Sequence, residues 1–180
     1  MERLLPFVIA DPEKCTGCRV CELACHSYHH IVGKTTGTVI GPIVPKLYVQ
    51  RKYRGEAPIQ CHQCEGAPCA RACAQKAIYF YRGQVVVDTM RCDNCQDCVQ
   101  ACPFGAIQLT PPDQDVVCVG LTGGETRLVG NKCDLCLGRK QGPVCVEECP
   151  VQALRLFHPL EDKRTKNIQA AKNGKYLGSK

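Results

Sequence analysis

Cysteine is the residue type in this chain whose number and spacing could do chemistry. A thiolate is a soft metal ligand, and four of them hold a cubane [4Fe–4S] cluster. Sixteen of the 17 cysteines fall into four groups of four: Cys15, Cys18, Cys21 and Cys25; Cys61, Cys64, Cys69 and Cys73; Cys92, Cys95, Cys98 and Cys102; and Cys133, Cys136, Cys145 and Cys149. Four such groups in 180 residues predict a protein that holds four [4Fe–4S] clusters.

The spacing within the groups indicates how the ligands are shared. The first and third groups have the ferredoxin spacing C-x2-C-x2-C-x3-C, whereas the second is C-x2-C-x4-C-x3-C and the fourth C-x2-C-x8-C-x3-C. The fourth cysteine of a ferredoxin group faces away from its own cluster, so we expect it to ligate a neighbouring one. Pro103 and Pro150 follow two of these fourth cysteines and would end a helix there, while His26 and Ala74 follow the others.

Zinc and disulfides explain the cysteines less well. The fourth group alone would suit a zinc ribbon, but zinc does not account for the regular x2, x2, x3 spacing. A disulfide-rich secreted scaffold would have an even cysteine count and a signal peptide. The remaining Cys118 lies in an apolar run and is expected to be a buried non-ligand in a strand. We also expect no ligand role for four histidines, of which His62 should point to the surface: His26, His29, His30 and His62.

The charge balance fits buried anionic clusters. The chain has 23 Lys and Arg against 17 Asp and Glu, a formal net charge of +6. A cluster with four thiolates carries about −2 when oxidised, so four would bring the holoprotein to about −2. We therefore interpret the basic excess as compensation for the clusters and expect no nucleic-acid binding. The absence of Trp and an aromatic content of 6% also argue against base stacking.

The elements that must position these cysteines can be outlined. A β-hairpin is predicted over Ala77–Asp88, turned at Arg82-Gly83, and the apolar segments Leu4–Ala10 and Ala153–Phe157 are expected to pair as strands. The predicted fold class is α+β, with two nested bacterial ferredoxin-like units, added β-hairpins and a polar C-terminal tail. The outer unit comprises residues 1–55 and 113–158, the inserted unit residues 56–112, and the basic tail residues 159–180.

Further elements are predicted outside the central hairpin. They are a strand over Val44–Tyr53, a hairpin of residues 115–120 and 125–130, short helices over Arg19–Tyr28 and Gln96–Cys102, and a tail helix over Leu160–Lys172. The tail is either a solvated end or a strap on a partner subunit, and the sequence favours neither.

Several motifs resemble those of a known family. They are Ala10–Cys18, Cys61–Cys69, Asn131–Cys136, and Gly142–Cys145 running into Cys149-Pro150. With the order of the groups and the longer fourth spacing, residues 4–157 resemble the four-cluster electron-transfer subunits that accompany larger redox enzymes. Such subunits serve formate dehydrogenase, formate hydrogenlyase, carbon monoxide dehydrogenase, tungsten aldehyde oxidoreductase and the dimethyl sulfoxide reductase family.

The resemblance implies four ligand sets, called A to D below. Set A would be Cys15, Cys18, Cys21 and Cys149; set B, Cys25, Cys133, Cys136 and Cys145; set C, Cys61, Cys64, Cys69 and Cys102; and set D, Cys73, Cys92, Cys95 and Cys98. Some relatives lack one ligand of the third group. Here all are present, so the resemblance implies four [4Fe–4S] clusters.

The resemblance further implies a non-catalytic subunit that relays electrons. Its partners would be a large catalytic subunit, of formate dehydrogenase, carbon monoxide dehydrogenase, aldehyde oxidoreductase or hydrogenase type, and a second electron-transfer protein. The sequence has no glycine-rich nucleotide motif. It has no 18-residue apolar stretch and no twin-Arg signal, so we expect no transmembrane segment and a cytoplasmic location. The alternatives are a free soluble polyferredoxin, which would usually be shorter and acidic, and a small catalytic iron–sulfur reductase, which would need an open iron site.

Overall fold

The structure is a computed structural model that describes residues 4–30, 42–52, 55–112 and 127–174. Its described residues form short helices and two-stranded antiparallel sheets, in agreement with the predicted α+β class. In chain order the elements are β1 (Phe7–Ala10), α1 (Val20–His30), β2 (Tyr48–Lys52), β3 (Gly55–Ile59), α2 (Pro68–Ala72), β4 (Ile78–Tyr81), β5 (Gln84–Val87), α3 (Asp97–Ala101), β6 (Gln108–Thr110), β7 (Val129–Asn131), α4 (Val144–Glu147), β8 (Leu154–Phe157) and α5 (Pro159–Gly174).

The first and last strands pair with each other, as predicted. β1 and β8 are antiparallel, with Phe7 opposite Phe157 and Ala10 opposite Leu154. The side chains of Val8 and Leu154 are buried in the core. Because β1 leads into the first cysteine group and β8 follows the fourth, this pairing brings the two groups together.

The central hairpin also forms as predicted. β4 and β5 pair antiparallel, with Ile78 opposite Val87 and Tyr81 opposite Gln84. The turn residues Arg82 and Gly83 have φ angles of 48° and 79°. Positive φ at both central residues is the mark of a type I′ turn, whose twist matches that of the paired strands.

The fourth cysteines do not all stand at the end of a helix. Cys73 and Cys102 cap α2 and α3 in an extended conformation, with φ and ψ of −76° and 102° in one case and −78° and 111° in the other. Of these two cysteines, only Cys102 is followed by proline, so proline is not required for this turn. At Cys25, by contrast, α1 continues to His30.

Two pairings differ from the sequence predictions. β2 pairs with β3, which the sequence did not predict because Pro58 interrupts a segment with little alternation. β7 pairs with β6, so one sheet crosses the predicted boundary at residue 112 between the two units. Most of the hairpin predicted over 115–120 and 125–130 lies outside the described residues, as does Cys118.

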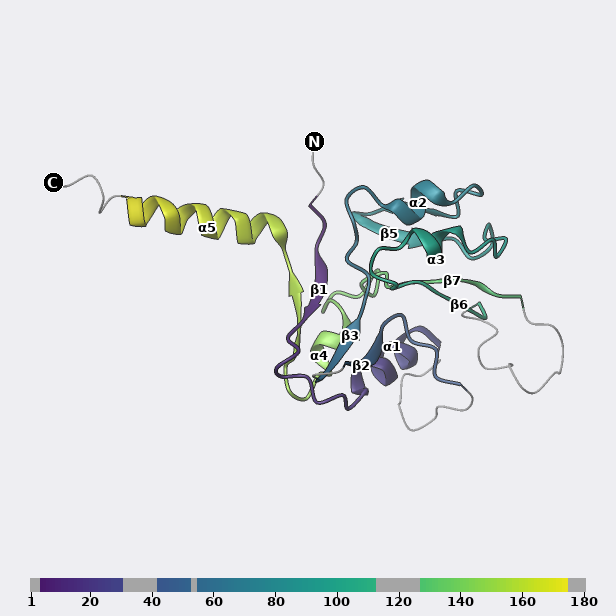
Figure 1. Cartoon of the computed structure of the whole chain (residues 1–180), viewed down its shortest axis with the longest axis horizontal. Helices are drawn as coiled ribbons and strands as arrows, with labels where there is room; N and C mark the ends of the chain where they lie inside the picture. The colour runs from purple at the N-terminus through teal and green to yellow at the C-terminus, as the bar shows by residue number, and fades with distance from the viewer. Residues whose placement is uncertain (1–3, 31–41, 53–54, 113–126, 175–180) are drawn as a thin grey trace.

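The core is small and contains many cysteines. Val8, Leu47, Val49 and Leu154 pack with cysteines of the first, second and fourth groups. A second cluster of buried residues, which includes Ile78, packs with cysteines of the second and third groups. Figure 1 shows α2, β5 and α3 on one side of β6 and β7, with α1, α4, β2 and β3 on the other.

Helix α5 points away from the rest of the molecule (Figure 1). This helix confirms the predicted tail helix, and it runs from Pro159 to Gly174. Its apolar side chains are exposed, Leu160 by 57% and Ile168 by 48%. None of the helices in the described part of the chain is long and apolar enough to cross a membrane.

Candidate iron–sulfur centres

Each cysteine group begins with a loop of the same backbone shape. The residue before the second cysteine has a positive φ in all four groups: Gly17 (69°), Gln63 (47°), Asn94 (65°) and Leu135 (54°). This left-handed residue curls the C-x2-C segment, and such curls turn backbone N–H groups inward. In two of the loops, this N–H donates to the first cysteine, from Gln63 to Cys61 Sγ and from Leu135 to Cys133 Sγ, each at 3.4 Å.

The fourth cysteine of three groups is followed by the same turn, which was not predicted from the sequence. In each, the Sγ accepts a hydrogen bond at 3.3 Å from the N–H of an alanine four residues later: Cys73 from Ala77, Cys102 from Ala106, and Cys149 from Ala153. The residue before each alanine has a positive φ: Lys76, Gly105 and Gln152. The pattern C-x3-A, repeated three times, is the sequence signal that could have revealed this turn. Cys25 instead accepts from the N–H of Lys46, at 3.3 Å.

Three hollows are lined by cysteines from two groups each. In every case three cysteines come from one group and the fourth from another. The hollows contain Cys15, Cys18, Cys21 and Cys149; Cys61, Cys64, Cys69 and Cys102; and Cys73, Cys92, Cys95 and Cys98. Within the described residues, no group of three or more His, Cys, Asp or Glu side chains is arranged for one metal ion. A cubane makes a different demand, because each of its thiolates binds a different iron.

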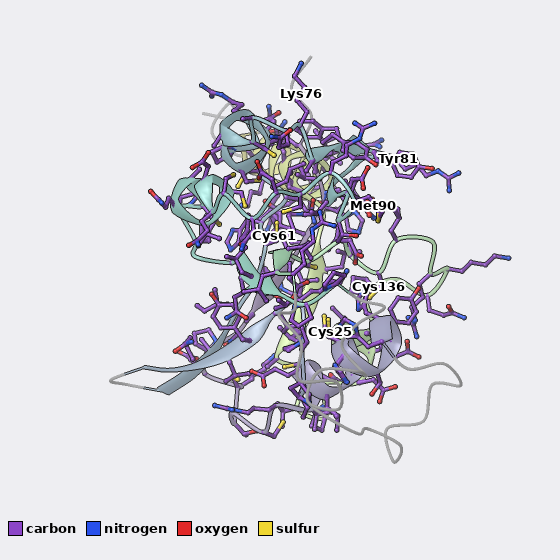
Figure 2. The ribbon with its side chains drawn as sticks, turned by 90° about the vertical axis from the view of Figure 1, so that its right-hand side faces the viewer. Cys25, Cys61, Lys76, Tyr81, Met90 and Cys136 are labelled. Atoms are coloured by element: carbon purple, nitrogen blue, oxygen red, sulfur yellow. The ribbon has the colours of Figure 1, made fainter. Side chains whose placement is uncertain are left out.

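The remaining four cysteines, which form set B, also lie near one another. Burial raises the pKa of Cys25 well above its ordinary value, and repulsion from Cys133 and Cys136 adds to the rise. Burial likewise raises the pKa of Cys145, with repulsion from Cys133, Cys25 and Cys136. All four side chains are buried. Figure 2 shows Cys25 and Cys136 in the same part of the molecule.

The bare thiols do not favour ionisation at these positions. Burial raises the pKa of Cys21 and of Cys133 to about 12, and that of Cys69 and of Cys98 to about 11. Neighbouring thiols repel one another when ionised, which raises these pKa values further. Metal ions of high positive charge beside these sulfurs would favour the thiolate over the thiol, and iron ligation requires the thiolate. The donor set therefore fits iron–sulfur clusters, whose iron supplies that charge.

A polar network beside set B was not predicted from the sequence. His29 Nε2 lies 3.1 Å from Asp134 Oδ1, and Lys46 Nζ lies 3.3 Å from Asp134 Oδ2. Burial alone would raise the pKa of Asp134, but the His29 hydrogen bond and the Lys46 charge lower it well below its usual range. His26 Nδ1 accepts from the N–H of Val44 at 3.0 Å, and His30 Nε2 donates to the Val44 carbonyl at 2.8 Å.

His62 does not simply point to the surface, contrary to the prediction. Its ring stacks on Phe104 with a centroid distance of 3.8 Å, and on Phe7 with a distance of 4.9 Å. Burial lowers the pKa of His62. His62 and Phe104 line the hollow of Cys61, Cys64 and their partners, so this stack keeps water from that side of the site.

Comparison with known proteins gives two matching family models and many relatives. Both models are described as a 4Fe-4S dicluster domain, and they match residues 54–120 and 91–154. Electron transport protein HydN of Escherichia coli (strain K12) is 38% identical over 149 residues, which cover 82% of this chain and 85% of that protein. Formate hydrogenlyase subunit 2 of the same strain is 36% identical over 170 residues, covering 83% and 80%.

A longer relative contains only a part that corresponds to this chain. Putative oxidoreductase AegA, also from Escherichia coli (strain K12), is 36% identical over 154 residues. The match covers 83% of this chain but 21% of AegA.

The fold and the cysteine sites define an iron–sulfur protein with ferredoxin-like 4Fe-4S domains. The match to HydN extends over most of both sequences. The chain therefore belongs to the ferredoxin-like family of iron–sulfur electron-transfer subunits.

Proposed function

We propose that this protein holds four [4Fe–4S] clusters with the ligand sets A to D and relays single electrons between a catalytic redox subunit and a second redox partner. It does not catalyse the partner's reaction. The observation that carries the proposal is the lining of the three hollows. Each joins three cysteines of one group to the fourth cysteine of another, which is how ferredoxins share their ligands.

Contacts between the sets support a serial order D–C–B–A. Sets D and C exchange their fourth cysteines. The thiol of Cys61 in set C contributes to the raised pKa of Cys133 in set B, after the larger effect of burial. Cys145 of set B is likewise repelled by Cys21 of set A, again after burial. In Figure 2, Cys61 lies between the end that carries Lys76 and the region of Cys25 and Cys136.

The exposure of the cysteines supports the same order. Cys18 of set A and Cys95 of set D are exposed, whereas every cysteine of set B is buried. Electrons would therefore enter and leave at the two ends of the row. This arrangement also suits the proposal of two nested ferredoxin-like units, with sets A and B in the outer unit and sets C and D in the inserted one.

The protein's own groups would hold and tune the clusters. When bound, a [4Fe–4S] cluster accepts and releases one electron at a time. The backbone N–H groups that point at cysteine sulfur favour the more negative form, because a hydrogen bond stabilises charge on its acceptor. The buried side chains around set B exclude water, and the stacked ring of His62 does so at set C.

The partner is proposed from two relatives. AegA, named an oxidoreductase, contains a segment that corresponds to this chain within a polypeptide about five times as long as that segment. The match covers 85% of HydN but 21% of AegA, so such a segment makes up most of one relative and a small part of the other. Where the segment makes up most of a protein, that protein is expected to associate with a separate redox protein. We therefore propose a large catalytic oxidoreductase subunit of the formate dehydrogenase, carbon monoxide dehydrogenase, aldehyde oxidoreductase or hydrogenase type. Formate hydrogenlyase subunit 2 supports a partner that acts on formate or hydrogen.

Iron content and electron transfer test this function. Anaerobically purified protein should contain about sixteen irons per chain, from four cubanes. Cys64→Ser should lose one cluster and stop transfer between partners, while the catalytic subunit still reduces an artificial dye. Cys118→Ser is the matched control and should keep the full iron content. About four irons, mainly zinc, or turnover of formate, carbon monoxide, aldehyde or hydrogen by the isolated chain would contradict the proposal.

A further inference from the structure

A buried lysine lies where the two inner ligand sets meet. The Lys132 side chain is 3% exposed. Its Nζ donates to the carbonyl oxygens of Val85 and Cys133, the latter at 2.8 Å. Cys133 belongs to set B, and Val85 lines the hollow of set C. The ammonium group therefore stands between the proposed positions of clusters B and C.

Gln63 holds the same two backbone segments without a charge. This residue is 1% exposed. Its Nε2 donates to the Cys133 carbonyl at 2.8 Å, and its Oε1 accepts from the N–H of Val85 at 2.7 Å. Because the neutral Gln63 side chain already bridges these two segments, holding them together does not require a cation at position 132.

Burying this cation costs free energy unless negative charge lies close by. Across the part of the chain that the structure describes, no carboxylate forms an ion pair with Lys132, and the nearby Asp134 is paired with Lys46 and His29. The neighbouring groups that can become anionic are cysteines of both inner sets. Burial raises the pKa of Cys64, Cys69 and Cys133, and the charge of Lys132 offsets part of this rise in each.

We propose that Lys132 is the counter-charge shared by clusters B and C, and that it raises the reduction potential of both. The inference rests on the proposed function, because it uses those two ligand sets. One added electron makes a cluster more negative, and a fixed cation nearby stabilises that form. Lys132 is thus a positioned charge that tunes the middle of the row, where an electron passes from one half of the protein to the other.

Potentiometry of the iron-loaded full chain tests this role. Iron analysis comes first, followed by a redox titration monitored by electron paramagnetic resonance. Lys132→Met and Lys132→Gln both remove the charge, and Gln keeps a donor for the carbonyl oxygens. In both variants, two of the four potentials should fall together. The reduced-to-oxidised ratio at a fixed solution potential should drop about tenfold for each, which corresponds to about 59 mV. The potentials of the other two clusters, A and D, should stay unchanged.

Two further variants separate charge from structure. Lys132→Arg keeps the charge and should keep all four potentials close to those of the unmodified protein. Gln63→Met removes hydrogen bonds from the same backbone groups but no charge, so it should lower the unfolding midpoint and leave the potentials in place. If Gln63→Met moves the same two potentials as far as Lys132→Gln does, packing explains the effect and the proposal is wrong.

Failure of this inference can be told apart from failure of the proposed function. Full iron content with unmoved potentials in the neutral Lys132 variants would overturn the role of Lys132 alone. A shift of all four potentials by the same amount, or of one only, would overturn it too. Fewer than four clusters in the unmodified protein would overturn the proposed function itself.

Discussion

At the scale of single residues, the Asp134 carboxylate accepts hydrogen bonds from three donors beside set B. Its Oδ1 accepts from the N–H of Cys136 at 2.9 Å as well as from His29, and its Oδ2 accepts from Lys46. Its lowered pKa keeps the carboxylate ionised at neutral pH. Asp93 occupies the same place in the third group and accepts from the N–H of Cys95 at 3.2 Å, but its other partner is the neutral Gln75.

Asp134→Asn should therefore destabilise the protein more than Asp93→Asn. We expect a loss of about 2–3 kcal/mol for Asp134→Asn, because it removes a negative charge from beside the partly buried Lys46. Asp93→Asn should cost clearly less, because this carboxylate is exposed and only neutral donors lose a partner. Denaturant unfolding of the iron-loaded proteins at pH 7, without oxygen, measures both. Equal losses would mean that the charge of Lys46 contributes nothing.

Some of these residues could be predicted from the sequence and others could not. The cysteine ligands could be proposed because short spacings restrict which sulfurs can meet around one cluster. Gly17 and Asn94 are residue types that tolerate a left-handed backbone, but Gln63 and Leu135 give no such signal. The contact between His29 and Asp134 joins residues 105 positions apart, which no local pattern reveals.

At the scale of elements, the turn that follows Cys73, Cys102 and Cys149 comes just before a strand, which is β4, β6 or β8. Gly105 lies in this turn with a φ of 59°, and an added Cβ would come no closer than 4.0 Å to the Tyr48 hydroxyl. A side chain would therefore meet backbone strain there and no steric clash.

Gly105→Ala should lower the free energy of unfolding by about 1 kcal/mol through this strain. Gly66→Ala is the control, because its Cβ would meet nothing within 4 Å and its φ lies outside the left-handed region. That change should be neutral or stabilise by up to about 1 kcal/mol. Thermal unfolding at equal iron content compares the two, and the prediction is wrong if Gly105→Ala is as stable as Gly66→Ala.

Helix α5 should be dispensable for the fold. Its side chains are largely exposed and the helix points away from the other elements. A chain that ends at His158 should keep its full iron content, and its unfolding free energy should stay within about 0.5 kcal/mol of the original. Loss of iron or of stability would show that α5 supports the clusters. If only transfer to the partner falls, the tail acts as the strap.

The prediction of the elements succeeded where local patterns were strong. The β4–β5 hairpin has runs of aromatic and β-branched residues with a glycine in its turn, and the terminal strands are apolar. The β2–β3 pair was missed because β3 is a short segment of Gly, Glu, Ala, Pro and Ile, which lacks a strand pattern. The β6–β7 pair joins segments about twenty residues apart, so its partner choice depends on the tertiary fold.

At the scale of the whole molecule, cluster loading is coupled to proton release. Each ligand must lose a proton, and burial raises the pKa of Cys21 and Cys133 to about 12. Below these values, the thiolate fraction rises about tenfold with each pH unit. Loading of the metal-free chain with iron and sulfide should therefore be faster at pH 8.5 than at pH 7. Anaerobic absorbance measurements follow the loading, and a rate that is flat over this range would contradict the prediction.

The pairing of β1 with β8 also has a consequence for how the protein is made on the ribosome. The ligands proposed for sets C and D all lie between Cys61 and Cys102, so these two clusters could be completed while the rest of the chain is still being synthesised. Set A waits for Cys149, and set B for Cys145. Until β8 has been synthesised, β1 has no strand to pair with, and the thiols of the first group stay exposed. Bringing the first and fourth groups together closes a long loop, which is entropically costly. Cluster assembly would then proceed from the middle of the chain outward, and the amino-terminal cysteines would be the last to be protected from oxygen.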